Sequence, residues 1–246
     1  LKLSSFAQKK HKRLEAAVLQ TADELLVTSL KTKTLFSELT STPISVLTNG
    51  FDFEISSDTP LDSKFTLSHI GSLFEGRNPS VLWKVLSDLI NESEDFAAAF
   101  QLNLIGSVSK EVMGAICSFG LESYVCNTGY IPHSDVLESQ KKTQLLLLIE
   151  EDSKETEYII PGKLFEYMAS KRPIIAIGPQ ASDIEKILNQ TQAGTYFRYD
   201  EGAALRTLLL QHFEAYKLQK LNVDSIGLEA YSRKSLTQQL AQKLLN

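Results

Sequence analysis

The chain has 246 residues, of which 43% are hydrophobic and 22% charged, and its formal net charge is -5. This length allows one large domain or one and a half small ones, and the composition has no disorder or low-complexity signature. The acidic balance argues against a nucleic-acid duplex as the main partner, because duplex binding depends on a basic surface that releases counterions from phosphates.

The cysteines and the longest apolar run bear on the compartment. Cys117 and Cys126 have no metal-ligand spacing and no nearby His pair, so we interpret both as reduced core thiols, which fits a cytoplasmic protein. The apolar run at 145–149 is far shorter than the ~20 residues of a spanning helix and predicts a strand. The chain opens without an initiator Met, a signal core or a cleavage site, so we expect a segment to precede it.

The first fifty residues predict the last part of an α/β domain. Leu14, Val18 and Leu19 recur at helical spacing within 6–22, and a basic cluster lies at 9–13. A membrane surface is one conceivable partner for this cluster, but a solvated helix face is the favoured interpretation, because positive charge alone is weak evidence for lipid. A strand, a helix and a second strand are predicted to follow, at 23–29, 31–39 and 44–52.

After a polar loop at 54–64, strands and helices alternate as in a doubly wound sheet. The strands are rich in Val, Ile and Leu without strict alternation, which predicts a parallel sheet covered by helices on both faces. The predicted strands are 65–71, 100–106, 123–129, 144–150, 173–178 and 194–199. The predicted helices include 78–93, 109–120 with a Gly cap at Gly120, 131–142, 182–190 and 231–245, and one in the segment "IIPGKLFEYMAS".

Ligands of such sheets bind outside the carboxyl ends of the strands, so three polar loops are candidates: "TNGFD", "IGSLFEGRNP" and "IIPGKLFEY". In the third loop, Gly162 and Lys163 open a helix, and free helix-start amides beside a Lys predict an anion site. Glu166, one turn further on, could accept bonds from ribose hydroxyls while the helix start holds the phosphates. The alternative is an ordinary i,i+3 surface pair of Lys163 and Glu166.

The second loop adds a glycine and a fixed cation. Gly71 permits close backbone approach, and the planar fork of Arg77 suits a phosphate oxygen. Neither the dinucleotide fingerprint nor the P-loop motif occurs. Seen alone, Arg77 is more often a surface residue than a ligand clamp.

The remaining polar candidates favour structural roles. We interpret His69 as a core histidine and His133 as a helix cap or solvated side chain. The acidic run at 150–152 has no third ligand nearby, so we interpret it as a solvated strand end and not as a metal site.

Four segments together carry a family resemblance. "TNGFD", "GSLFEGRNP", "GYIPHSDV" and "PGKLFEYMASKRPIIAIGP" resemble, in order and spacing, the C-terminal half of retaining glycosyltransferases of family 4, which have the two-domain GT-B fold. The resemblance covers Thr48 to Asp200 firmly. It implies a Rossmann-like nucleotide-sugar-binding domain at 49–228, after a remnant of the N-terminal acceptor domain at 1–48 and before a crossover helix at 229–246.

The resemblance also implies site roles and partners. Glu166 would hold the ribose, Arg77 and Lys163 the diphosphate, and the helix-start amides would assist. The donor-binding residues by resemblance are Gly71, Arg77, Gly129, Tyr130, Ile131, Gly162, Lys163, Leu164 and Glu166. The partners would be a nucleotide sugar and, through the rest of the enzyme, a saccharide or lipid-linked acceptor, with no metal or cofactor. The enzyme would be a hexosyltransferase of polysaccharide synthesis, cytoplasmic or peripheral to the inner face of the membrane.

Two alternatives stay open. In the family, an acid often stands where this chain has Tyr158, with Glu157 one residue away, which leaves room for a degenerate module without catalysis. A nucleotide-sugar epimerase ranks lower, because none of the four His residues lies in the three loops. We expect the chain not to transfer sugar alone, and to expose apolar surface and self-associate where its N-terminal domain is truncated.

Overall fold

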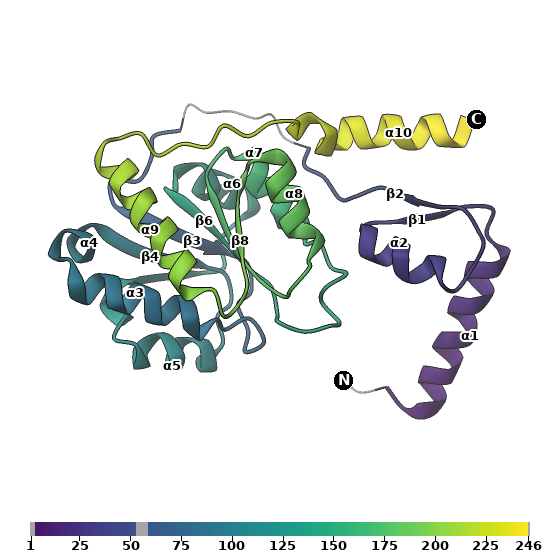
Figure 1. The fold of residues 1–246 in the computed structure, drawn as a ribbon, viewed down its shortest axis with the longest axis horizontal. Coiled ribbons are helices and arrows are strands. Elements are labelled where there is room, and N and C mark those ends of the chain that lie inside the picture. Colours follow the sequence, from purple (N-terminus) through teal and green to yellow (C-terminus); the bar gives the residue numbers. More distant parts are fainter. Residues whose placement is uncertain (1–2, 53–58, 246) are drawn as a thin grey trace.

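A six-stranded, all-parallel sheet forms the centre of the computed structural model, which describes residues 3–52 and 59–245 (Figure 1). The strand order is β5-β4-β3-β6-β7-β8. The strands are β3 (Phe65–Ile70), β4 (Phe100–Ile105), β5 (Val125–Gly129), β6 (Leu145–Ile149), β7 (Ile174–Ile177) and β8 (Gly194–Phe197). The chain winds outward from β3 in one direction and from β6 in the other, so the switch point lies between these two strands. The prediction of a doubly wound α/β domain is confirmed.

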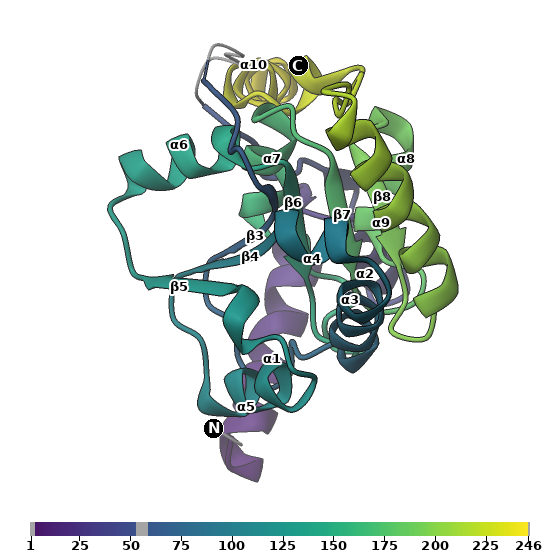
Figure 2. The ribbon, with the colours of Figure 1, turned by 90° about the vertical axis from the view of Figure 1, so that its left-hand side faces the viewer.

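Helices cover both faces of this sheet, and each face has its own apolar core. One core holds side chains of α3 (Ser80–Glu92), α4 (Glu94–Ala99), α5 (Lys110–Ser118) and α9 (Gly202–Lys217). The other holds side chains of α6 (His133–Lys142), α7 (Gly162–Ala169) and α8 (Asp183–Thr191). The sheet separates α6 and α7 from α3 and α5 (Figure 2). The short helix α4 was not predicted, because six residues are too few to show a helical apolar pattern.

The apolar run of β6 is buried completely because the strand lies in the middle of the sheet. Leu145, Leu147 and Ile149 belong to one core, while Leu146 and Leu148 belong to the other. The run was predicted as a strand, and the structure confirms it. No helix in the described part of the chain is long and apolar enough to cross a membrane.

The N-terminal residues form a separate layer. It comprises α1 (Ser5–Thr21), β1 (Leu25–Val27), α2 (Leu30–Ser37) and β2 (Ile44–Val46), with β1 and β2 paired in parallel. After the short 3-10 turn η2 (Leu228–Tyr231), α10 (Arg233–Leu245) lies beside this layer (Figure 1). The Lys243 Nζ atom of α10 lies 2.8 Å from the Glu24 Oε1 atom. Residues 54–58 of the predicted polar loop lie outside the described part of the chain.

Apolar side chains are exposed on this N-terminal layer, as expected. Leu14 and Val18 of α1 and Leu26 of β1 are exposed, and they line a groove of about 460 Å³. Self-association through this face stays a prediction. The basic cluster at 9–13 is exposed too, which fits a solvated helix face.

The interpretation of the cysteines as core thiols is wrong, because both Cys117 and Cys126 are exposed. On α5 the inward positions are taken by Val112 and Ile116, which leaves Cys117 on the outer face. Cys126 lies on β5, which is an edge strand of the sheet. The local sequence pattern does not indicate that either thiol is exposed.

His212 on α9 should make the fold less stable in acid. Burial, with a smaller effect from Arg172, lowers the pKa of His212 to about 4. An unfolded His has a pKa of about 6.5. Between about pH 6.5 and pH 4 the unfolded state therefore binds a proton that the folded state does not bind. The free energy of unfolding falls as the pH is lowered through this range. Between pH 7 and pH 5 this group should remove about 1–2 kcal/mol from the free energy of unfolding.

Urea unfolding of wild type and His212→Gln at pH 7 and pH 5 checks this expectation. The acid-induced loss should be smaller in the variant by that amount. His69, whose pKa burial also lowers, contributes equally to both proteins and cancels in the comparison. Equal losses in the two proteins would contradict the prediction.

Candidate functional site

The carboxyl ends of the strands form one edge of the sheet, the carboxyl edge. At this edge the ends of β3, β4 and β5 are packed tightly against one another. The Gly71 amide donates to the Ile105 carbonyl at 2.7 Å, and the Gly106 amide donates to the Gly129 carbonyl at 2.7 Å. Gly71 and Gly106 have φ angles of 120° and 125°, and a Cβ on Gly106 would lie 2.5 Å from the Gly71 carbonyl oxygen. The sequence therefore needs glycine here, and the paired backbones form a floor without side chains.

A pocket of about 240 Å³ opens above this floor, between the strand ends and helices α6 and α7. Its walls are largely apolar, and its polar side chains include Gln140, Lys163 and Glu166. Five of the predicted site residues line it, namely Gly71, Tyr130, Ile131, Lys163 and Glu166. Tyr130 is 91% exposed, so its ring is open to a flat ligand group.

Helix α7 is fixed to the end of β3 by a tyrosine that sequence reasoning missed. The Tyr167 hydroxyl accepts a bond from the Ile70 amide at 2.9 Å and donates to the Ile70 carbonyl at 3.3 Å. Burial raises the pKa of Tyr167, so the hydroxyl keeps its proton. Leu164 and Phe165 are fully buried beside it, and this apolar inner face sets the position of the polar residues of the helix.

The start of α7 brings a cation to the pocket. Lys163 is half-buried, and its Nζ atom lies 3.7 Å from where a Cβ of Gly71 would stand. Burial lowers the pKa of Lys163 to about 8, with Glu150 opposing this shift and Arg77 adding to it. The Leu164 amide, expected to be free, donates to the Pro161 carbonyl at 3.1 Å. The amides of Gly162 and Lys163 are therefore better placed for an anion.

Glu151 and Asp152 are exposed, as predicted for the strand end at 150–152. The prediction is wrong for Glu150, whose side chain is only 2% exposed. Its Oε2 atom accepts a bond from Arg77 Nη2 at 3.2 Å. Burial raises the pKa of the Glu150 carboxyl, while the nearby cations Arg77 and Lys163 lower it. Tyr199 donates its hydroxyl to the Glu150 carbonyl at 2.8 Å and covers this end of β6. Two cations, Arg77 and Lys163, thus act on one buried carboxylate.

Among the described residues, Glu166 forms no ion pair with Lys163, so the alternative of an i,i+3 surface pair is wrong. Instead, Gln140 of α6 donates its Nε2–H to Glu166 Oε2 at 3.2 Å. Gln140 was not a predicted site residue, since a Gln in a polar helix gives no signal of a site. Glu157, the acid nearest to Tyr158, forms an ion pair with Lys31 of α2 and thus joins the N-terminal layer to the main sheet.

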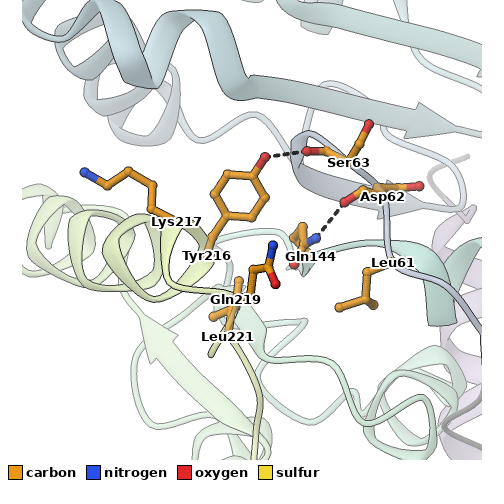
Figure 3. Close-up of a pocket in the computed structure, with 8 residues that line it drawn as sticks. All are labelled: Leu61, Asp62, Ser63, Gln144, Tyr216, Lys217, Gln219 and Leu221. Atoms are coloured by element: carbon orange, nitrogen blue, oxygen red, sulfur yellow. Dashed lines mark hydrogen bonds between the residues drawn. The ribbon is translucent and has the colours of Figure 1, made fainter.

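A second pocket, with a volume of about 540 Å³, lies at the opposite edge of the sheet (Figure 3). Several of its polar groups are paired with one another. Tyr216 donates its hydroxyl to the Ser63 carbonyl, and Gln144 donates to the Asp62 carbonyl at 2.7 Å (Figure 3). The Asp62 carboxylate accepts a bond from Thr66 at 2.9 Å. These contacts fix β3, β6 and α9 to one another, so we assign this pocket a structural role. Within the residues described, no three His, Cys, Asp or Glu side chains gather as a metal site.

Known proteins resemble this chain in structure but not in sequence. No family model matches the sequence, and no curated protein matches it. The structure is similar to HepE from Anabaena in complex with UDP and glucose, with a TM-score of 0.72 and 17% identity over 97% of this chain and 67% of that one. It is also similar to sucrose-phosphate synthase from Thermosynechococcus elongatus, with a TM-score of 0.68 and 15% identity over 99% of this chain and 63% of that one.

A third similar structure is WaaG, a glycosyltransferase involved in lipopolysaccharide biosynthesis, with a TM-score of 0.66 and 15% identity. That match covers 88% of this chain and 61% of WaaG. The chain spans about three fifths to two thirds of the length of these proteins. Over nearly its whole length, the chain has the fold of these GT-B glycosyltransferases.

Proposed function

We propose that this chain is the nucleotide-sugar-binding part of a GT-B glycosyltransferase. The observation that carries the proposal is that Lys163 and Glu166 line one pocket at the carboxyl edge of the sheet. A cation and a carboxylate one helical turn apart match the two polar ends of a nucleoside diphosphate, the phosphates and the ribose diol. The complex of HepE with UDP and glucose, on the same fold, supports this choice of ligand.

In this proposal the site stabilises a leaving diphosphate. Lys163, the amides of Gly162 and Lys163, and Arg77 hold the phosphate oxygens, while the base lies beside the loop at 129–131. Negative charge grows on the diphosphate as the bond to the sugar breaks, so fixed cations bind the transition state more tightly than the ground state. Arg77 would share its guanidinium between Glu150 and the phosphates. The side chains supply positive charge without a metal.

The finer expectations extend the same proposal. Residues 49–228 would bind the donor, while 1–48 and 229–246 would connect it to an acceptor domain that binds a saccharide or a lipid-linked acceptor. Transfer would retain the anomeric configuration and serve cell-surface polysaccharide synthesis, with the enzyme in the cytoplasm or at the inner face of the membrane. The described chain by itself would bind the donor without transferring the sugar.

Calorimetric titration with UDP and GDP, free and as sugar conjugates, tests the proposal, and Glu166→Ala should weaken binding clearly. Loss of a charged hydrogen-bond partner costs about 1–3 kcal/mol, or roughly 5- to 150-fold in affinity. The matched control is Glu138→Ala, because Glu138 is an exposed carboxylate of the neighbouring helix that pairs with Lys142 at 2.7 Å. This control should bind like wild type.

Two outcomes would contradict the proposal. One is a folded wild-type protein that binds none of these nucleotides. The other is an affinity that Glu166→Ala and Glu138→Ala leave equally unchanged.

One contact favours a second candidate, a nucleotide-binding module without catalysis. The carboxylate of Glu157 is paired with Lys31, and Tyr158 stands where the family often has an acid. Neither position therefore offers a free carboxylate to the sugar of the donor. Slow hydrolysis of a bound nucleotide sugar separates the two candidates. Release of free sugar by the full-length enzyme, lost in Lys163→Met, would favour the transferase, and its absence despite tight binding would favour the module.

A further inference from the structure

Helix α6 has an unusual inward residue. Of its ten residues, all of which the structure describes, only Gln140 is buried, with 1% exposure. The apolar Val136, one turn earlier, is only partly buried against the same core. A position of this kind in an amphipathic helix normally holds Leu, Ile or Met, because burying an amide is unfavourable unless both of its ends are hydrogen-bonded.

The amide of Gln140 is bonded at one end only. Its Nε2 atom donates to Glu166 Oε2 at 3.2 Å, while its Oε1 atom is buried without a hydrogen-bond partner in the described part of the chain. The orientation of the amide follows from its neighbour, since only the NH₂ end can donate to a carboxylate. A buried acceptor left unpaired lowers stability, so an apolar side chain of similar size would serve the fold better.

The contact instead serves Glu166, which is half-buried at the rim of the pocket. Next to it, Tyr167 fixes the backbone of α7 to β3, so the remaining freedom of Glu166 is in its own side-chain torsions. A bond from Gln140 to Oε2 restricts those torsions. The Oε1 atom of Glu166 and its unused lone pairs then stay available for hydroxyl donors.

We propose that Gln140 is a positioning residue that holds the Glu166 carboxylate in place for a pair of ligand hydroxyls, and so makes the pocket selective for ribonucleotides. The proposal rests on the proposed function, in which Glu166 binds the ribose of a nucleoside diphosphate. It adds a residue on a different helix and a preference for ribose over a sugar that lacks both hydroxyls.

The test combines stability with two ligands. Gln140→Met keeps the side-chain volume and removes the unpaired oxygen, so it should unfold at the same or a higher urea concentration than wild type. Calorimetric titration with UDP should show an affinity that is about 5- to 10-fold weaker than that of wild type. Titration with 2′,3′-dideoxyuridine diphosphate should show no more than a twofold change, because that ligand has no hydroxyl for Glu166 to accept.

A second variant covers the case in which Gln140→Met fails to fold. Gln140→Glu places two carboxylates side by side, so one of them should take up a proton at a raised pKa. The protonated side chain can donate to Glu166 as the amide does. UDP affinity should therefore be weak at pH 8 and recover towards the wild-type value as the pH falls to 5.5, relative to the wild-type profile.

The outcomes separate this proposal from the one on which it rests. If Glu166→Ala loses UDP binding but the Gln140 variants keep the wild-type preference for UDP over the dideoxy ligand, the positioning role is wrong and the donor site stands. A Gln140→Met protein that is destabilised and loses both ligands alike would show a purely structural residue. If wild type does not bind UDP, both proposals fail. Gln190→Met, at an exposed position of α8, should change none of these values.

Discussion

Replacing Lys163 by Met should weaken the binding of UDP by about 10- to 100-fold, the effect of losing a charged hydrogen-bond donor. Met keeps the apolar stem of the half-buried side chain but removes the cation nearest to the strand-end floor. Calorimetric titration measures the change. Lys154→Met, an exposed lysine of the β6–α7 connection, is the control and should bind UDP like wild type. Equal affinities for all three proteins would contradict the role of Lys163.

The same lysine predicts a pH dependence of binding. Burial lowers the pKa of Lys163 to about 8 in the free protein, and a bound diphosphate would raise it again. The contribution of the cation to affinity is therefore fully present below about pH 8 and is lost as the pH rises above that value. Titrations from pH 7 to pH 9.5 should show wild-type affinity falling, while Lys163→Met changes little. Parallel profiles would contradict the assignment.

Replacing Arg172 by Met should destabilise the fold by about 3 kcal/mol, because three buried acceptors would lose their donor. Arg172 is 8% exposed and donates to the carbonyls of Thr143, Gln144 and Leu221 at 2.9, 3.0 and 3.3 Å. It thereby ties the start of β6 to the segment after α9. Burial lowers its pKa to about 10, so it remains charged at neutral pH.

Urea unfolding of Arg172→Met measures the loss, with Lys171→Met as the control on an exposed neighbour. The control should change the free energy of unfolding by less than about 0.5 kcal/mol. UDP affinity of the folded fraction should stay at the wild-type value, because Arg172 lies away from the carboxyl edge. A stability equal to that of wild type would show that water replaces the guanidinium at these carbonyls.

The sheet could be predicted because its strands are short apolar runs buried on both faces, as β6 shows. The meeting of the loops after β3 and before α7 followed from the rule that ligands bind at the switch point. The start of α7 was recognisable from Pro161 and Gly162, and the structure places Lys163 and Glu166 of that helix in one pocket.

What the sequence did not reveal depends on packing between distant segments. Glu150 looks like a solvated strand end, yet Tyr199 covers it and Arg77 neutralises it from the loop after β3. Gln140 reads as one of several polar residues of an exposed helix, and only the folded chain brings its amide to Glu166. Such partners lie 26 to 73 positions apart in sequence, beyond the reach of local patterns.

The most direct measurement of the central claim is a crystal structure of this chain with UDP bound. Our account predicts the diphosphate within hydrogen-bond distance of Lys163 and Arg77, and the ribose hydroxyls at the Glu166 carboxylate. UDP bound instead in the pocket at the opposite edge, beside Asp62 and Tyr216, would contradict it, as would a carboxyl edge left empty at a UDP concentration that saturates the protein in solution.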